Sequence, residues 1–142
     1  MQTAPATPID PAELPSMLAT LCWYESWLGP YHPQTLCLMA QVGFTYCQAG
    51  EFDQARPLLE KVVGDVGRHI ARDHDLRLRA MAALRDLFIA RSDYERARAV
   101  QRELLECQVR RLGGDHTETL ATRSHLAMML LEQMTCESER EV

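Results

Sequence analysis

The sequence predicts an all-α fold in which about six helices form a stack of antiparallel pairs. Three observations predict it: a repeat of 42 residues, helical spacing of the apolar residues within each repeat, and the lack of strand-like alternation. The repeat is clearest in His32, His74 and His116, which lie 42 residues apart. The same offset aligns apolar residues in three copies: Leu28, Ile70 and Leu112; Leu36, Leu78 and Leu120; Val42, Leu84 and Leu126; Tyr46, Phe88 and Leu130.

Composition narrows the class of protein. The 142 residues suffice for one domain, and 46% hydrophobic, 25% charged and 6% aromatic residues are typical of a globular protein. A net charge of −5 does not favour a nucleic-acid partner, and no apolar run is long enough to cross a bilayer. Because the start of the chain lacks the pattern of a secretory signal, we expect a cytoplasmic protein without a membrane partner.

The first element expected is a flexible arm over residues 1–15, which contains prolines at positions 5, 8, 11 and 15. A helix then begins either at Asp10, which could act as N-cap, or at Ser16, because Pro15 would remove a helical hydrogen bond. The sequence leaves both starts open. The stop signal Leu28-Gly29-Pro30 ends this helix.

A pair of helices follows in the first repeat. Pro33 suits a first helical position, which makes Tyr31 or His32 the cap. After a turn at Ala49-Gly50, a second apolar stripe runs from Phe52 to Ile70.

The later repeats follow the same plan. Asp73 and Asp115 are the expected caps of their first helices. Arg85 stands where the first copy has the small Gly43, so it should prevent equally close helix packing unless its stem reaches outward. The pattern fails after Gln133. We therefore expect a repeat domain over residues 16–134, with a last helix at 117–134 and an acidic tail at 135–142.

Two junctions carry a resemblance to a known family. The segments Leu28-Gly29-Pro30-Tyr31-His32-Pro33-Gln34-Thr35-Leu36 and Leu112-Gly113-Gly114-Asp115-His116-Thr117-Glu118-Thr119-Leu120 resemble the LG-x-DHP-x-TL junction of tetratricopeptide repeats, in the 42-residue variety found in kinesin light chains. Gly43, Tyr46, Gly50, Phe52 and Ala55 match its small, aromatic and alanine positions. The resemblance implies a right-handed superhelical stack that binds a partner protein or peptide.

In this family the first helix of each pair lines a concave groove. The resemblance therefore implies a set of partner-binding positions on three helices. They are Cys37, Ala40, Gln41, Phe44 and Cys47, then Arg79, Ala82, Asp86 and Ile89, then Ala121, Ser124, His125, Met128 and Leu131. This lining is largely apolar and lacks the asparagines of the kinesin-type groove, so we expect a peptide or helix held by hydrophobic side chains.

The last predicted helix is apolar on more than one face and has no following partner helix in the repeat pattern. We expect a homodimer to form there, through Leu126, Met129, Leu130 and Met134.

The remaining residue patterns predict no catalytic site, no cofactor and no metal site. No phosphate loop, GxSxG or HExxH motif occurs, and we expect no enzyme. Histidines on successive repeats lie too far apart to share a zinc ion, so they should cap or brace the loops. The five cysteines show no CxxC pair and should be reduced and mostly buried, and Trp23 and Trp27 should fill the core. The alternative is a helical sensor or enzyme that uses the cluster from His69 to Asp75.

Overall fold

The computed structural model describes residues 11–141, in which every regular element is helical. A 3₁₀ turn, η1 (Pro11–Glu13), precedes six α-helices, which confirms the predicted all-α class. The helices are α1 (Leu14–Trp27), α2 (Pro33–Gln48), α3 (Phe52–His69), α4 (Asp75–Ala90), α5 (Tyr94–Leu112) and α6 (Thr117–Arg140). None of them is both long and apolar enough to span a membrane.

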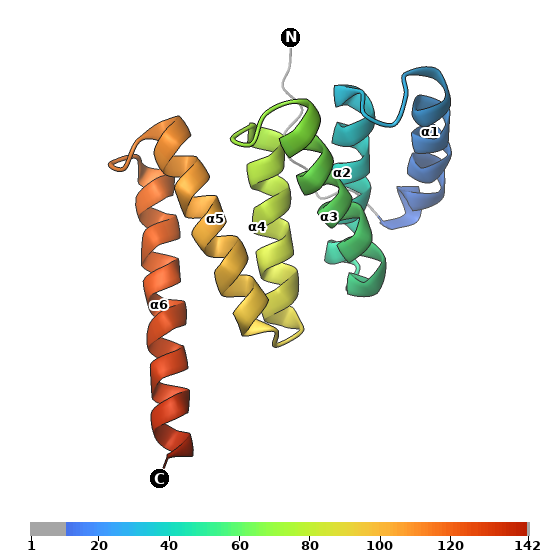
Figure 1. Cartoon of the computed structure of the whole chain (residues 1–142). Coiled ribbons are helices and arrows are strands. Elements are labelled where there is room, and N and C mark those ends of the chain that lie inside the picture. Colours follow the sequence, from blue (N-terminus) through green and yellow to red (C-terminus); the bar gives the residue numbers. More distant parts are fainter. Residues whose placement is uncertain (1–10, 142) are drawn as a thin grey trace. The chain divides into compact units, whose positions relative to one another are not determined.

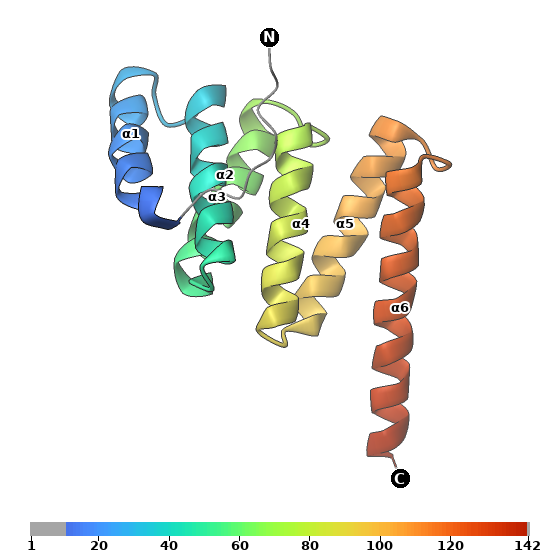
Figure 2. The same cartoon turned by 180° about the vertical axis from the view of Figure 1, so that it is seen from behind.

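The helices form two compact units. Unit 1 ends at Ala71 and contains η1 to α3, and unit 2 begins at Arg72 and contains α4 to α6. In unit 1, α2 packs against α1 and α3; in unit 2, α5 packs against α4 and α6. Figures 1 and 2 show that consecutive helices within each unit run in opposite directions and are joined by short turns.

The predicted apolar stripes form the core of each unit. In unit 1 the fully buried side chains come from α2 and α3: Leu36, Met39, Ala40, Val42, Ala55, Leu59, Val62 and Val66. In unit 2 the buried apolar side chains come mainly from α4 and α5: Ala80, Met81, Leu84, Leu87, Phe88, Ala97, Leu104 and Cys107. Burial of side chains at helical spacing is the main force that holds each helix against its neighbour.

The close packing of α2 against α3 depends on Gly43. A Cβ atom at this position would lie 2.8 Å from Leu59 Cδ2, closer than packed carbons approach. The same repeat position in unit 2 is Arg85, which faces Gln101 at the position of Leu59. Arg85 Nη1 donates to Gln101 Oε1 at 3.0 Å, and Gln101 Nε2 donates to the Thr122 carbonyl at 3.0 Å. A polar pair therefore replaces the glycine–leucine contact.

Replacement of Arg85 by alanine should lower the free energy of unfolding of unit 2 by about 1–3 kcal/mol, because Gln101 Oε1 would stay buried without its donor. Urea unfolding followed by far-UV circular dichroism measures the change. The matched control is Arg56→Ala, which removes an exposed i,i+4 pair with Glu60 and should cost less than about 0.5 kcal/mol. An equal cost for both variants would contradict this account of the pair.

The three repeated histidines cap helices. His32, His74 and His116 are the N-caps of α2, α4 and α6, and each Nδ1 accepts a hydrogen bond from the backbone N–H two residues later. The N···N distances are 3.2, 3.1 and 3.2 Å. The prediction that the histidines cap the loops is confirmed, and His32 is the cap chosen over Tyr31. The prediction of Asp73 and Asp115 as caps was wrong, because the imidazole at the next position supplies the acceptor.

His74→Ala should destabilise unit 2 by about 1 kcal/mol, since the Leu76 N–H loses its side-chain acceptor. His74→Asn keeps an acceptor at the N-cap and should restore most of the loss. Thermal unfolding of the two variants checks this difference, and a His74→Asn protein no more stable than His74→Ala would argue against a capping role.

The helices extend beyond the predicted domain limits. Residues 11–15, assigned to the flexible arm, contain η1 and the first two residues of α1. The helix α1 starts at Leu14, so Pro15 lies in the first turn, where a backbone N–H has no intrahelical acceptor and its absence removes no helical hydrogen bond. Asp10 and the rest of the predicted arm, residues 1–10, lie outside the described residues. At the other end α6 continues to Arg140, through most of the predicted acidic tail.

Two predictions about burial were wrong. Of the five cysteines only Cys107 is buried, while Cys47 is half-buried and the other three are exposed. Trp23 and Trp27 do not fill the core, because 56% and 73% of their surfaces are exposed. Their rings lie 6.0 Å apart on the surface of α1.

Candidate functional site

Unit 2 contains a hollow of about 460 Å³ between α4 and α6, with α5 as its floor. We call it the α4–α6 hollow. Its lining residues come from three helices and the turn before α6. They are Asp75, Leu78, Arg79, Ala82 and Arg85, then Leu104, Gln108, Arg111 and Leu112, then His116, Glu118 and Thr122.

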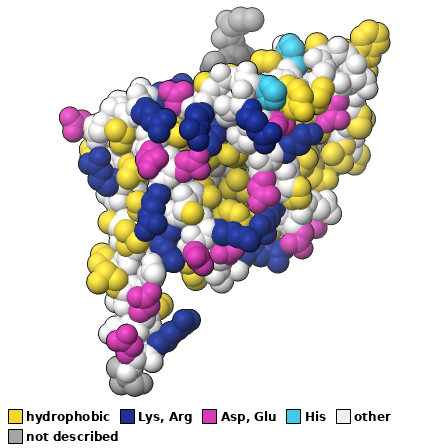
Figure 3. All heavy atoms as spheres, in the orientation of Figure 1, with side chains coloured by type: hydrophobic (Ala, Val, Ile, Leu, Met, Phe, Trp, Pro, Cys, Tyr) yellow, Lys and Arg dark blue, Asp and Glu magenta, His cyan; other side chains and the backbone are white. Residues whose placement is uncertain are grey.

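The hollow combines apolar side chains with a basic rim. Leu78 and Leu104 are buried, and Ala82 and Leu112 are half-buried. The rim carries three arginines and two acids, which gives a formal charge of +1. Figure 3 shows that basic and acidic side chains lie interspersed with hydrophobic ones on the face drawn there. Such a lining suits a ligand with apolar groups and an anionic group.

Two rim arginines are held in place by the unit itself. Arg111 Nη1 donates to the Asp73 carbonyl at 3.1 Å and lies 3.9 Å from Asp75 Oδ1. Arg85 Nη2 lies 3.0 Å from Asp86 Oδ1, in addition to its bond with Gln101. These contacts fix the guanidinium groups and lower the entropy that a ligand must remove.

Gln108 is the most informative residue of the hollow. It is only 8% exposed, and its Oε1 is buried without a hydrogen-bond donor. A buried acceptor of this kind costs about 1–3 kcal/mol when it stays unpaired. Because Gln108 lines the hollow, an N–H group of a bound ligand could supply the missing donor.

The structure brings only part of the predicted groove into this site. Arg79 and Ala82 line the α4–α6 hollow, but the other predicted residues of α4 and α6 do not. Those others are Asp86, Ile89, Ala121, Ser124, His125, Met128 and Leu131. The hollow is also more basic than the apolar lining predicted. On α2, Cys37 and Gln41 are exposed and Phe44 and Cys47 half-buried, but Ala40 is fully buried and cannot contact a partner.

Sequence reasoning missed Gln108, although the repeat contained a signal for it. Gln108 stands at the position that Val66 holds in the first copy, where an apolar residue is expected. A polar residue at a repeat position that is otherwise apolar is not explained by core packing, and such a position is a candidate for a functional site.

A second surface feature of unit 2 is the exposed side of α6. Leu120, Met128, Leu131 and Met134 are between 45% and 65% exposed. Of the predicted dimer residues, Met134 belongs to this surface and Leu126 and Leu130 are half-buried. Met129 is 7% exposed, so its placement in the dimer interface was wrong: it faces the body of unit 2.

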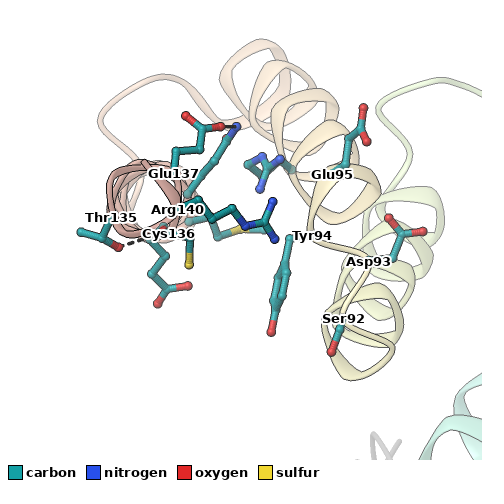
Figure 4. A pocket seen from close by; sticks show the side chains of 12 residues that line it. Ser92, Asp93, Tyr94, Glu95, Thr135, Cys136, Glu137 and Arg140 are labelled. Carbon is teal, nitrogen blue, oxygen red and sulfur yellow. Dashed lines mark hydrogen bonds between the residues drawn. The ribbon is translucent and has the colours of Figure 1, made fainter. Parts of the chain in front are cut away.

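A second hollow, of about 640 Å³, opens between the start of α5 and the last turns of α6. Figure 4 shows Tyr94 and Glu95 on one side and Cys136, Glu137 and Arg140 on the other. Its lining contains four acids and two arginines, and no buried unpaired polar atom of the described residues belongs to it. The α4–α6 hollow is therefore the better candidate site.

The cluster from His69 to Asp75 shows no joint site. His74 caps α4, the carbonyl of Asp73 and the carboxylate of Asp75 face Arg111, and His69 stacks on Tyr31 with 4.2 Å between ring centroids. Across residues 11–141, no group of three or more His, Cys, Asp or Glu side chains could hold a metal ion. These contacts give each residue of the cluster a local structural role.

Comparisons with known proteins agree with this architecture. Residues 35–74 match the family model described as tetratricopeptide repeat. Among 26 matching chains of solved structures is a Podosopora anserina protein described as a kinesin light chain with nearly identical TPR-like repeats. It is 20% identical, with a TM-score of 0.75 over 89% of this chain, which spans 60% of the length of that protein. No curated protein sequence matches the chain. Residues 35–74 thus match a tetratricopeptide repeat, and the chain shares the all-α fold of a TPR-like repeat structure, as the junction residues predicted.

Proposed function

We propose that the chain is a non-enzymatic scaffold of the cytoplasm that binds a peptide segment of a partner protein in the α4–α6 hollow. Tetratricopeptide repeats are in general protein-interaction modules, and this supports the class of function. The single observation that carries the proposal is the buried, unpaired Gln108 Oε1 in a hollow with an arginine rim.

The lining defines the chemistry of the peptide. Leu78, Ala82 and Leu104 favour an apolar side chain, and Arg79 and Arg111 favour a carboxylate. A backbone N–H of the peptide would donate to Gln108 Oε1. We therefore propose an extended segment with an acidic residue beside an apolar one. This differs from the purely apolar peptide that the sequence alone favoured.

Selection from a random peptide library displayed on phage tests the proposal. Peptides enriched on the full chain should share an acidic residue next to an apolar residue. Their dissociation constants, measured by fluorescence anisotropy, should rise about tenfold or more for Arg79→Glu, since a like charge replaces the attractive one.

The matched control is Arg102→Glu, an exposed arginine of α5 outside the hollow. It makes the same change of net charge and should leave the dissociation constants within about twofold. If the enriched peptides bind Arg79→Glu and the wild type with equal dissociation constants, the α4–α6 hollow is not the peptide-binding site.

The exposed side of α6 supports a second proposal, that the chain self-associates through this helix. Contiguous exposed apolar side chains on one helix face are typical of an interface. Hydrophobic side chains are visible along the free stretch of α6 in Figure 3. Light scattering at rising protein concentration tests it: the mass should increase toward that of a dimer, and a constant monomer mass at high micromolar concentration would contradict it.

A further inference from the structure

Comparison with the earlier copies of the 42-residue repeat shows that the exposed side of α6 includes positions that are buried in α2 and α4. Leu36 of α2 and Leu78 of α4 are 0% and 7% exposed, but Leu120 at the same position of α6 is 45% exposed. Ala127 of α6 is likewise exposed, whereas Gly43 at the same position of α2 packs on Leu59 of α3. The position of Ala127 faces the following helix in both earlier pairs, since Gly43 packs on Leu59 of α3 and Arg85 bonds to Gln101 of α5. We call Leu120, Ala127, Leu131 and Met134 the open α6 face.

The other end of the described chain has the complementary surface. Helix α1 corresponds in the repeat to α3 and α5, the second helices of their pairs. On α5, Cys107 and Leu104 are 3% and 2% exposed, and Cys107 Sγ lies 3.5 Å from Arg77 Nη1 of α4. In α1 the position of Cys107 is occupied by Trp23, which is 56% exposed, and the position of Leu104 is occupied by Thr20, which is also exposed. With Trp27 they form what we call the open α1 face.

The two faces match in size and chemistry. Helix α1 has 14 residues and is about 21 Å long, which equals the length of α6 between Leu120 and Met134. The repeat register pairs the small Ala127 with Met17, as Gly43 pairs with Leu59. At the position of Arg77, which contacts Cys107, α6 has Thr119, and Thr119 is fully buried. Arg123, one turn later on α6, is exposed, and an exposed arginine beside the exposed Trp23 permits a cation–π contact.

We propose that the open α6 face of one copy binds the open α1 face of a second copy, so that copies associate head to tail. The intermolecular pair then reproduces the α2–α3 and α4–α5 packing. This inference rests on the self-association proposed above and specifies its geometry. Such a contact is heterologous, because it joins two different faces, and each copy therefore offers one further face for another copy.

Two variants separate this geometry from a symmetric α6–α6 contact. Leu120→Glu/Ala127→Glu places charge on the open α6 face, and Trp23→Glu/Trp27→Glu places charge on the open α1 face. All four side chains are exposed in the single chain, so far-UV circular dichroism should stay unchanged. The controls are Ala121→Glu on another side of α6 and Ser26→Glu on another side of α1, both at exposed positions.

Sedimentation velocity should show that the wild type and the controls form dimers and larger species as concentration rises, and that each variant alone is a monomer. An equimolar mixture of the two variants should form a dimer and nothing larger, since each partner retains one intact face. Tryptophan emission of the wild type should shift to shorter wavelength with concentration, because Trp23 and Trp27 are the only two tryptophans of the chain.

Two results would overturn the inference and are distinguishable. If the wild type associates and the Trp23→Glu/Trp27→Glu variant associates equally well, self-association stands but the head-to-tail geometry fails. If the wild type stays monomeric at high micromolar concentration with unshifted tryptophan emission, both the inference and the underlying self-association fail.

Discussion

Leu36→Ala is expected to lower the free energy of unfolding of unit 1 by about 2–5 kcal/mol, the range for a large side chain removed from a packed core. Leu36 is fully buried between the helices of unit 1. The cost comes from the lost burial of its methyl groups and from the cavity that a rigid helix pair cannot close. Urea unfolding followed by far-UV circular dichroism measures it.

The repeat supplies a matched control for this variant. Leu120→Ala makes the same chemical change at the same repeat position, but Leu120 is 45% exposed. Its cost should be below about 1 kcal/mol for monomeric protein. Equal costs for Leu36→Ala and Leu120→Ala would contradict the assignment of α6 as a helix whose pairing face is open.

Gly43→Leu is expected to have a comparable effect, about 3 kcal/mol of destabilisation, through overpacking. Even a Cβ would approach Leu59 Cδ2 to 2.8 Å and Leu59 Cγ to 3.0 Å, and leucine adds three further carbons. The small gain in helix propensity over glycine, about 1 kcal/mol, does not offset this clash. Thermal unfolding of unit 1 measures the net change.

Ala127→Leu is the corresponding control on α6. Ala127 is exposed, so the larger side chain meets no neighbour within the chain and should change stability by no more than about 0.5 kcal/mol. A Gly43→Leu protein as stable as the wild type would show that α2 and α3 do not pack as closely as described.

The helices could be predicted from the sequence because the repeat shows the same helical pattern in three copies. The position of Leu36, Leu78 and Leu120 is apolar in every copy, and one offset therefore aligns whole helices. The N-caps were harder to assign, since aspartate is a common cap and stands directly before His74 and His116. The histidine periodicity was the better guide, because an identical residue at an identical position indicates an identical role.

The candidate site was less predictable, because exposure depends on which neighbours a helix lacks. Trp23 was expected in the core but lies on the surface, and Ala40 was expected in the groove but is fully buried. Gln108 could not be identified from the sequence, because the burial of its Oε1 without a hydrogen-bond donor depends on how the helices pack around α5.

The most direct test of the proposed peptide site is a ¹H–¹⁵N correlation spectrum of the labelled chain, titrated with a peptide selected on the wild type. The largest shift changes should fall on the lining of the α4–α6 hollow, with the side-chain amide of Gln108 and the backbone amides of Arg79 and Ala82 among them. A saturable titration whose shifts fall elsewhere, with the Gln108 amide unmoved, would contradict the account.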